Sequence, residues 1–142
     1  MIKAAFFDVD GTLLSHKSKS VPQSTRAALD KLKAAGITCI VATGRQIQEM
    51  EKLPSADLTF DGYITLNGQL ILDGEKQVLH GTPIRGEVKD YLLKLFDGHT
   101  IPILMVERDR VFLNFVDGRV ERVQERISSP IPPLGEYDGG EF

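Results

Sequence analysis

Two carboxylates near the start of the chain are the residues best suited to chemistry. Asp8 and Asp10 follow an apolar run, residues 4–7, and Gly11 and Thr12 come next. Such a run is typical of a strand buried in a parallel sheet, and open α/β sheets bind ligands at the carboxyl ends of their strands. One ionised carboxylate could act as nucleophile and cation ligand while the other carries a proton, which predicts magnesium-assisted phosphoryl transfer. Taken alone, the same residues also fit an ordinary Asp-Gly turn.

A second polar group follows the next apolar run, residues 37–42. Thr43 and Gly44 lie where we expect a helix to begin, and the free amides of helix N-termini bind anions. Thr43 could equally be only a helix cap. Arg45 could contact a substrate anion or lie in solvent. Beside the two acids, the combination favours phosphate binding at Thr43 and Gly44.

A third polar position, Asn67, follows the apolar residues 63–66 and precedes Gly68. Asn-Gly between apolar runs is a strong signal for a β-hairpin. We therefore expect a hairpin here, with Asn67 making a secondary contribution to the site.

The elements that position these residues follow from the apolar pattern. A strand over residues 4–7, a helix that opens near Pro22 and closes at Gly36, and a strand over residues 37–42 predict a right-handed βαβ unit with parallel strands. A short helix over residues 46–53 should follow. Another hairpin is expected from residues 70–72 and 77–79, joined through Asp73-Gly74.

The pattern changes near residue 82. Residues 1–81 are predicted to form an incomplete Rossmann-like α/β core, and residues 82–142 to begin an α+β cap domain with a Pro/Gly-rich tail. The cap part should contain a helix, an antiparallel hairpin and a further charged segment. The predicted apolar face of the helix consists of Val88, Tyr91, Leu92, Leu95 and Phe96, and the predicted strands cover residues 101–106 and 111–116. The tail from Ser128 to Gly140 is expected to be a linker or a frayed terminus.

The motifs resemble a known superfamily. Asp8-Val-Asp10-Gly-Thr12-Leu-Leu and Ile40-Val-Ala-Thr43-Gly-Arg45 are similar to the first two motifs of the haloacid dehalogenase-like phosphohydrolases. Residues 60–71 resemble the Cof-type branch, whose members are mostly phosphatases of sugar phosphates and other small phosphorylated metabolites. The likeness is strong over about the first 80 residues and weak beyond them.

The resemblance implies roles for these residues. Asp8 would attack phosphorus to give an aspartyl-phosphate, and Asp10 would protonate the leaving oxygen and then activate water. The implied cofactor is Mg²⁺, held by the Asp8 carboxylate and the Asp10 main-chain carbonyl. Thr12 would brace the loop. The predicted substrate-binding or phosphate-binding residues are Thr12, Thr43, Gly44, Arg45 and Asn67.

Two parts of the family pattern are not found in the 142 residues: a Lys or Arg for the phosphoryl group, and a Gly-Asp with another acid for the metal. In the branch resembled, these follow an inserted cap domain, so we expect the sequence to stop inside the cap. The core would keep about three strands, and we expect weak or no activity and self-association through the uncovered sheet edge. Alternatives are a non-catalytic binding or interaction module, a phosphotransferase or phosphomutase of the same superfamily, and a signalling receiver domain.

Composition narrows the class of partner. The net charge of −3 is spread without a basic stripe, so nucleic acid is not an expected partner. The apolar runs are far shorter than the ~18 residues of a membrane helix, and Met1 leads directly into strand-like sequence without a signal peptide. The single cysteine, Cys39, is predicted to be a buried apolar residue. A small phosphorylated metabolite and a cytoplasmic location are therefore expected.

Overall fold

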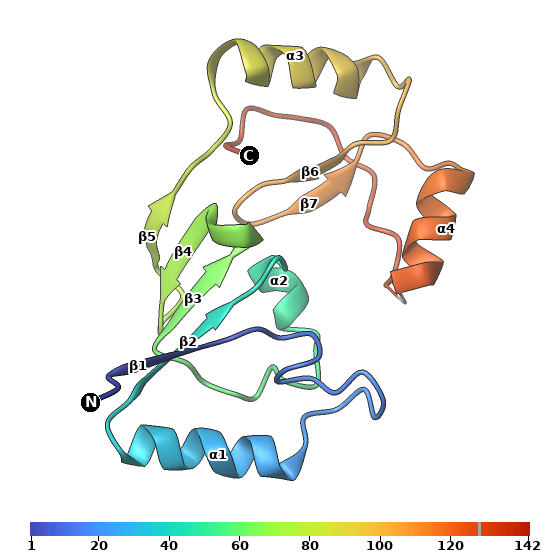
Figure 1. Cartoon of the computed structure of the whole chain (residues 1–142). Helices are drawn as coiled ribbons and strands as arrows, with labels where there is room; N and C mark the ends of the chain where they lie inside the picture. The colour runs from blue at the N-terminus through green and yellow to red at the C-terminus, as the bar shows by residue number, and fades with distance from the viewer. Residues whose placement is uncertain (128) are drawn as a thin grey trace. The chain divides into compact units, whose positions relative to one another are not determined.

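The computed structural model describes residues 1–127 and 129–142, and its internal contacts divide the chain into two units, Met1–Thr82 and Pro83–Phe142. The elements of both units are labelled in Figure 1. The first unit contains β1 (Ala4–Phe7), α1 (Gln23–Ala34), β2 (Thr38–Ala42), α2 (Ile47–Met50), β3 (Gly62–Thr65), the 3-10 turn η1 (Leu66–Gly68), β4 (Leu70–Asp73) and β5 (Val78–Gly81). The second contains α3 (Gly86–Asp97), β6 (Leu104–Val106), β7 (Val111–Leu113) and α4 (Gly118–Ile127).

The first unit is built on one mixed sheet with the order β1-β2-β3-β4-β5. β1, β2 and β3 are parallel neighbours, and β4 and β5 extend the sheet in antiparallel fashion. The predicted βαβ unit and the predicted hairpin are both confirmed. The predicted core of about three strands corresponds to the parallel part of this sheet. The fold class is therefore the predicted Rossmann-like α/β class.

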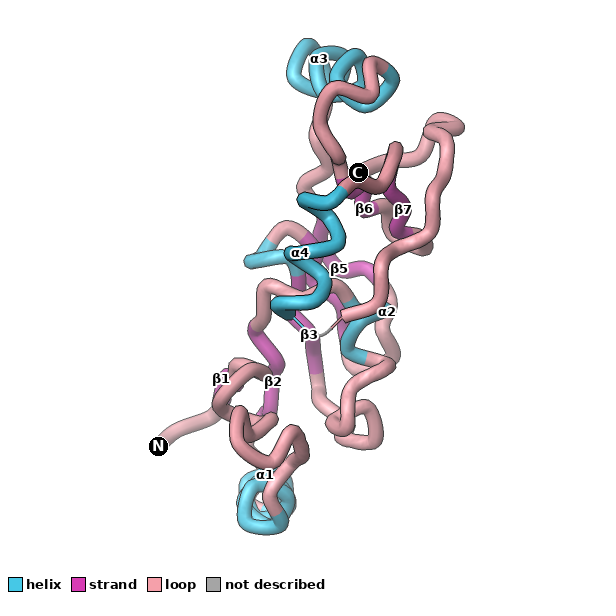
Figure 2. Tube along the Cα trace, turned by 90° about the vertical axis from the view of Figure 1, so that its right-hand side faces the viewer, coloured by secondary structure: helices cyan, strands magenta, loops and turns pink. Residues whose placement is uncertain are grey.

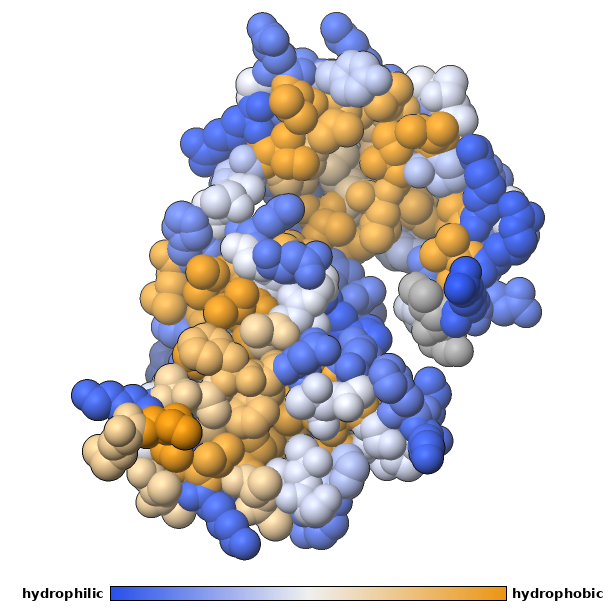
Figure 3. Space-filling model, in the orientation of Figure 1, coloured by the Kyte–Doolittle hydropathy of each residue, from blue (hydrophilic) through white to orange (hydrophobic). Residues whose placement is uncertain are grey.

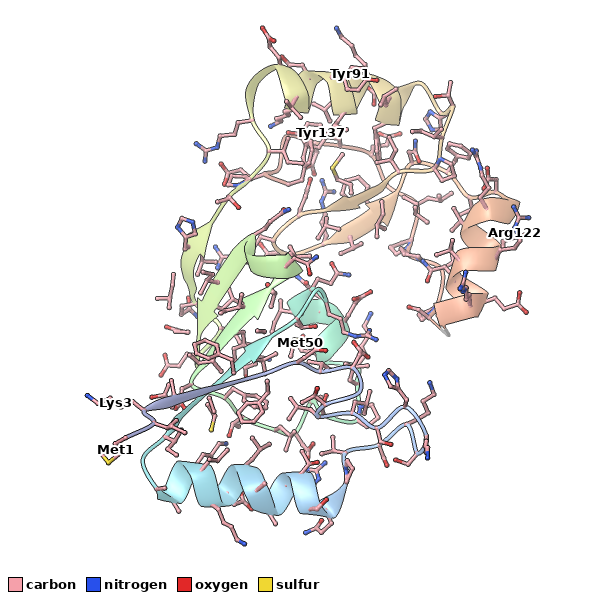
Figure 4. The ribbon with its side chains drawn as sticks, viewed as in Figure 1. Met1, Lys3, Met50, Tyr91, Arg122 and Tyr137 are labelled. Atoms are coloured by element: carbon pink, nitrogen blue, oxygen red, sulfur yellow. The ribbon has the colours of Figure 1, made fainter. Side chains whose placement is uncertain are left out.

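One face of this sheet is buried. Alternate residues of β2, Cys39 and Val41, are fully buried on it. The helix α1 lies beside β1 and β2 in both views (Figures 1 and 2). Leu29 of α1 and Met50 of α2 (Figure 4) belong to the same hydrophobic core as Val41 and Tyr63 of the strands. Cys39 of β2 is fully buried there, as predicted. Burial of this apolar face is the main stabilising term for the unit.

The other face of the sheet is uncovered at β1. Ile2 and Phe6 are 74% and 60% exposed, and Phe6 stands beside the half-buried Ile40 of β2. Figure 3 shows apolar side chains gathered at this N-terminal part of the unit. Among the described residues, β1 is an edge strand that pairs only with β2. Parallel sheets are normally covered on both faces, so this surface is unusual for the class.

The second unit has a small core of its own. Phe96 of α3, Met105 of β6 and Phe112 of β7 form it, and β6 and β7 make the predicted antiparallel hairpin with shorter strands than expected. The predicted apolar face of α3 is partly wrong, because Val88 and Tyr91 are 60% and 61% exposed. The short two-stranded sheet meets only the C-terminal part of α3, so the N-terminal part has no sheet to cover.

The prediction of a linker or frayed terminus is wrong from Pro133 onward. The Leu113 amide donates a hydrogen bond of 2.8 Å to the Pro133 carbonyl, which adds the segment to the edge of β7. Tyr137 (Figure 4) and Phe142 pack on the small core. Their burial outweighs the disordering effect of the Pro and Gly residues. Ser128, where the predicted tail begins, lies outside the described residues.

No helix in residues 1–127 or 129–142 is long and apolar enough to cross a membrane.

Candidate active site

The ends of three neighbouring strands define the candidate site. β1, β2 and β3 run parallel, so their carboxyl ends meet at one edge of the sheet. Asp8 follows β1 directly and Thr43 follows β2 directly, and the pairing of Phe7 with Val41 places them within one residue of the same level. Adjacent strands lie about 4.8 Å apart, so these polar residues are close neighbours.

The first loop is anchored by one buried apolar side chain between the carboxylates and another just after them. Val9 and Leu13 are 0% and 1% exposed, whereas Asp8 is exposed and Asp10 is half-buried. Gly11 has φ 83°, a left-handed conformation that allows the chain to reverse. The sequence of buried and exposed residues therefore turns both carboxylates to the outside of the sheet edge.

The second loop differs from the prediction at Thr43 and Gly44. The short helix predicted over residues 46–53 begins within one residue of the expected start but covers only Ile47–Met50, a single turn, so the helix start expected at Thr43 and Gly44 is wrong. The Arg45 amide donates to the Thr43 hydroxyl at 3.2 Å, and the Thr43 amide donates to the Ile64 carbonyl at 2.9 Å. These bonds hold residues 43–46 in a non-helical loop. A helix this short offers no macrodipole for an anion, so phosphate binding would rest on the loop itself.

The turn after β3 closes the site on its third side. β3 and β4 form the predicted hairpin, and the Asn67 amide donates to the Thr43 carbonyl at 3.1 Å. The Leu66 amide donates to the Arg45 carbonyl, also at 3.1 Å. The carboxamide of Asn67 lies against Gly44, where an added Cβ would come within 3.0 Å of Oδ1. The turn and the second loop are thus a single hydrogen-bonded unit.

Arg45 and Asp10 form a bidentate ion pair. Arg45 Nε lies 2.7 Å from one carboxylate oxygen of Asp10, and Nη2 lies 2.9 Å from the other. Hydrogen bonding to Arg45 lowers the pKa of Asp10 against the opposing effect of burial, with further help from the charges of Arg45, His16 and Lys19. The same contact raises the pKa of Arg45. Arg45 is therefore committed to Asp10 in this state.

The residues present fit part of a magnesium site. Hydrogen bonds within the first loop occupy the carbonyl oxygens of Asp8 and Val9 and leave that of Asp10 unused by the loop. The Asp8 carboxylate and the Asp10 carbonyl are hard oxygen ligands, and Mg²⁺ commonly keeps several waters beside one or two protein ligands. In the described ranges, no three His, Cys, Asp or Glu side chains gather around a common point. The described residues therefore offer two of the expected magnesium ligands, the Asp8 carboxylate and the Asp10 carbonyl.

The candidate site is open to solvent. Asp8, Thr12 and Asn67 are all exposed. Two surface hollows lie elsewhere: one is lined by Lys33, Thr38 and Phe60 among others, and the other lies within the second unit. Neither hollow includes the residues at the strand ends, so the candidate site is an open surface.

The predicted residues thus differ in how closely they are assembled. Asp10, Thr43, Gly44, Arg45 and Asn67 are joined by direct contacts, and Asp8 stands next to them at the end of β1. Thr12 is exposed in the first loop. The amides of Gly11, Leu13 and Leu14 donate the backbone hydrogen bonds that cross this loop.

Sequence reasoning missed two features of the site. Leu66 has φ 50°, a left-handed conformation that no local sequence signal predicts for a leucine. The ring of His16 lies over Gly11, where an added Cβ would come within 2.5 Å of Nε2. Only the polar composition of residues 15–20 could have hinted at a loop that folds back on the site.

Comparison with known proteins identifies the family. The haloacid dehalogenase-like hydrolase family matches residues 5–132, which are most of the 142 residues, and the chain therefore belongs to it. The chain is similar to the HMP-PP phosphatase of Yersinia pestis (strain Pestoides F), with 38% identity over 97 residues, which are 66% of this chain and 34% of that protein. The predicted resemblance to Cof-type phosphohydrolases is confirmed.

Solved structures agree with this assignment. The phosphatase BT1666 from Bacteroides thetaiotaomicron matches with a TM-score of 0.78 and 29% identity, over 96% of this chain and 50% of that one. The subclass IIB sugar phosphatase BT4131 matches with a TM-score of 0.70 and 29% identity, over 94% and 52%. The chain spans about half the length of these structures and about a third of the Yersinia phosphatase.

The ion pair makes a prediction about acid stability. Because the pKa of Asp10 is lowered in the folded state, the ion pair stabilises the fold above the ordinary Asp value of 3.8, and this stabilisation is lost as the pH falls through the lower folded pKa. Arg45→Gln should reduce the free energy of unfolding at pH 7 by up to about 1 kcal/mol, since both side chains are about a third exposed. Chemical denaturation at pH 7 and pH 2 measures the difference.

Lys52→Gln is the matched control, because it removes an exposed positive charge just after α2. The Arg45 variant should differ from the wild type much less at pH 2 than at pH 7. A difference of the same size at both pH values would show that the ion pair with Asp10 is not the cause.

Proposed function

We propose that this chain carries the nucleophile and the acid of a Mg²⁺-dependent phosphohydrolase that acts on small phosphorylated metabolites through an aspartyl-phosphate. The observation that carries the proposal is the assembly of Asp8 and Asp10 with Thr43 and Gly44 at the carboxyl ends of adjacent parallel strands. The names of the similar proteins, an HMP-PP phosphatase and a sugar phosphatase, support a small phosphorylated substrate.

Asp8 is the proposed nucleophile because its carboxylate is exposed at the end of β1. A carboxylate oxygen of Asp8 forms a bond to phosphorus while the bond from phosphorus to the ester oxygen breaks, and the ester oxygen takes a proton from Asp10. Asp10 then takes a proton from water, whose oxygen attacks phosphorus and breaks the bond to Asp8. Magnesium, when bound to the Asp8 carboxylate and the Asp10 carbonyl, would neutralise charge on the transferring group.

Arg45 has to release Asp10 during this cycle. A carboxylate held by two hydrogen bonds from a guanidinium is ionised, whereas the first step requires a protonated Asp10. We propose that the phosphoryl or another anionic group of the substrate attracts Arg45 away, since a guanidinium binds phosphate in the same bidentate manner. Thr12, Thr43, Gly44 and Asn67 are the other proposed contacts to the substrate.

The remaining catalytic groups are proposed to lie outside these residues. The chain spans about half of the similar solved structures, and the described residues supply only part of the metal-ligand set. A phosphate-binding Lys and a further metal carboxylate would complete the site in a longer protein. Transfer of the phosphoryl group to an alcohol instead of water would use the same nucleophile. The open, partial site also fits a non-catalytic binding module. We further propose a cytoplasmic location.

Beryllofluoride tests the nucleophile directly, because it bonds to an aspartate carboxylate as a mimic of a phosphoryl group. We expect ¹⁹F NMR to show a bound signal with wild-type chain in the presence of Mg²⁺. The signal should disappear with Asp8→Asn, which keeps the shape but removes the charged oxygen, and with EDTA. Asp30→Asn, at an exposed position of α1, is the matched control and should retain it. A signal that persists in Asp8→Asn would rule out Asp8 as the nucleophile.

Hydrolysis of a phosphomonoester by this 142-residue chain should be very slow. With Mg²⁺ and p-nitrophenyl phosphate we expect less than about a thousandth of a typical kcat of about 10 s⁻¹, because the groups proposed to stabilise the transferring charge are incomplete. Release of p-nitrophenol measures the rate. Rapid turnover that Asp8→Asn abolishes would show that these residues suffice for catalysis.

The chain is also proposed to self-associate through β1. Among the described residues, β1 is an edge strand with one side unpaired, and Phe6 of the strand and Ile2 just before it are exposed. An exposed apolar edge strand can pair with a second copy of itself. Charged residues flank the strand, with Lys3 directly before it and Asp8 directly after it.

Phe6→Lys tests this proposal, because a charged side chain on an edge strand opposes pairing. Sedimentation velocity should show a concentration-dependent increase in mass for the wild type and a monomer for the variant. The free energy of unfolding should change by less than about 0.5 kcal/mol per exposed site. Val88→Lys is the matched control, because Val88 of α3 is equally exposed at 60% and should leave association unchanged. Equal association in all three proteins would contradict the proposal.

A further inference from the structure

The turn between β3 and β4 is more strained than a hairpin requires. Leu66, Asn67 and Gly68 have φ values of 50°, 55° and 94°, which are three consecutive left-handed residues. The loop joins Thr65 to Leu70 through four residues, and hairpin loops of this length are most often built around a type I turn, whose central residues have negative φ. Leucine has no side-chain group that eases this conformation, so Leu66 carries a conformational cost that the connection of two strands does not explain.

The strained turn is held in place by its neighbours. The Thr65 hydroxyl, which is fully buried, donates to the Leu70 carbonyl at 3.0 Å across the base of the turn. The amides of Leu66 and Asn67 donate to the carbonyls of Arg45 and Thr43. The left-handed conformation is what directs both amides back to the loop after β2. The cost of the turn is therefore linked to its attachment to the candidate site.

This attachment puts the Asn67 carboxamide beside Gly44. The position of a Cβ on Gly44 lies 3.0 Å from Oδ1 and 3.5 Å from Nδ2, so the side chain lies across the glycine. Asn67 remains exposed in spite of this contact. A Cβ at position 44 would press on the carboxamide, which would have to shift by a few tenths of an ångström, so glycine leaves the Asn67 side chain where it lies. The Asn67 carboxamide, whose Nδ2 carries two N–H donors, thus lies next to Thr43 at the edge of the sheet where Asp8 also lies.

We infer that the strained turn serves to present Asn67 to the substrate, with Nδ2 donating a hydrogen bond to an oxygen of the phosphoryl group that Asp8 receives. The inference rests on the proposed function, and it adds a reason for the strain and for Gly44. Strained backbone is retained at sites where it pre-organises a binding group. Asn67 in this role is a binding residue, and Leu66 positions it.

The test compares beryllofluoride binding, in the presence of Mg²⁺, between the wild type, Asn67→Gly and Asn67→Asp. Glycine accepts the left-handed conformation but lacks the carboxamide, and aspartate accepts it but brings a negative charge toward the anion. Lys76→Gly is the matched control, because Lys76 also has a positive φ, 61°, in the turn between β4 and β5. Thermal melting of each variant verifies folding, and none should melt below the wild type by more than about 4 °C.

We expect Asn67→Gly to weaken beryllofluoride binding about two- to tenfold, the effect of one neutral hydrogen bond, and Asn67→Asp to weaken it further. Lys76→Gly should bind like the wild type. Wild-type affinity in both Asn67 variants would overturn the inference and leave the proposed function intact. Failure of the wild type itself to bind the probe would overturn both.

Discussion

The parallel pairing of β1, β2 and β3 is the constraint on which the rest of the structure depends. Parallel strands end at the same edge, so the polar residues that follow each strand meet there although Asp8 and Asn67 are 59 residues apart in the chain. The pairing is fixed in turn by the buried face of the sheet, because a shift of one residue would turn Cys39 and Val41 away from the core. Burial of apolar side chains thus determines where the carboxylates lie.

Hydrogen bonds across the strand ends then join the separate loops. The Thr43 amide bonds to β3, and the turn after β3 bonds back to Thr43 and Arg45. Arg45 reaches in the other direction to Asp10. Because each loop of the candidate site is hydrogen-bonded to another, displacement of Arg45 by an anion would change the surroundings of Asp10 and of the second loop together. In the proposed function, substrate binding would therefore favour the protonated form of Asp10.

The uncovered face of the sheet contrasts with the buried face, because its apolar side chains at β1 are exposed. The buried face has enough apolar contact to hold α1 and the segment around α2 in place, but Ile2 and Phe6 remain exposed on the other side. The chain matches about half of each similar phosphatase structure, and both the partial metal-ligand set and the open site agree with a partial catalytic assembly. The same region of the chain therefore combines the loop of the proposed nucleophile with an exposed apolar surface.

The sequence by itself determined the α/β class, the βαβ unit, both hairpins of the first unit and the two acids, because apolar runs of fixed period and short motifs are local properties. It could not give the conformation of residues 43–46, the left-handed Leu66 or the ion pair between Arg45 and Asp10. These depend on hydrogen bonds between residues that are distant in sequence. The apolar stripe of α3 was misread for a similar reason, since only the size of the sheet beneath the helix decides which residues are buried. Tertiary structure also decided that the Pro/Gly-rich C-terminal segment packs, because Tyr137 and Phe142 find a core that local propensity does not record.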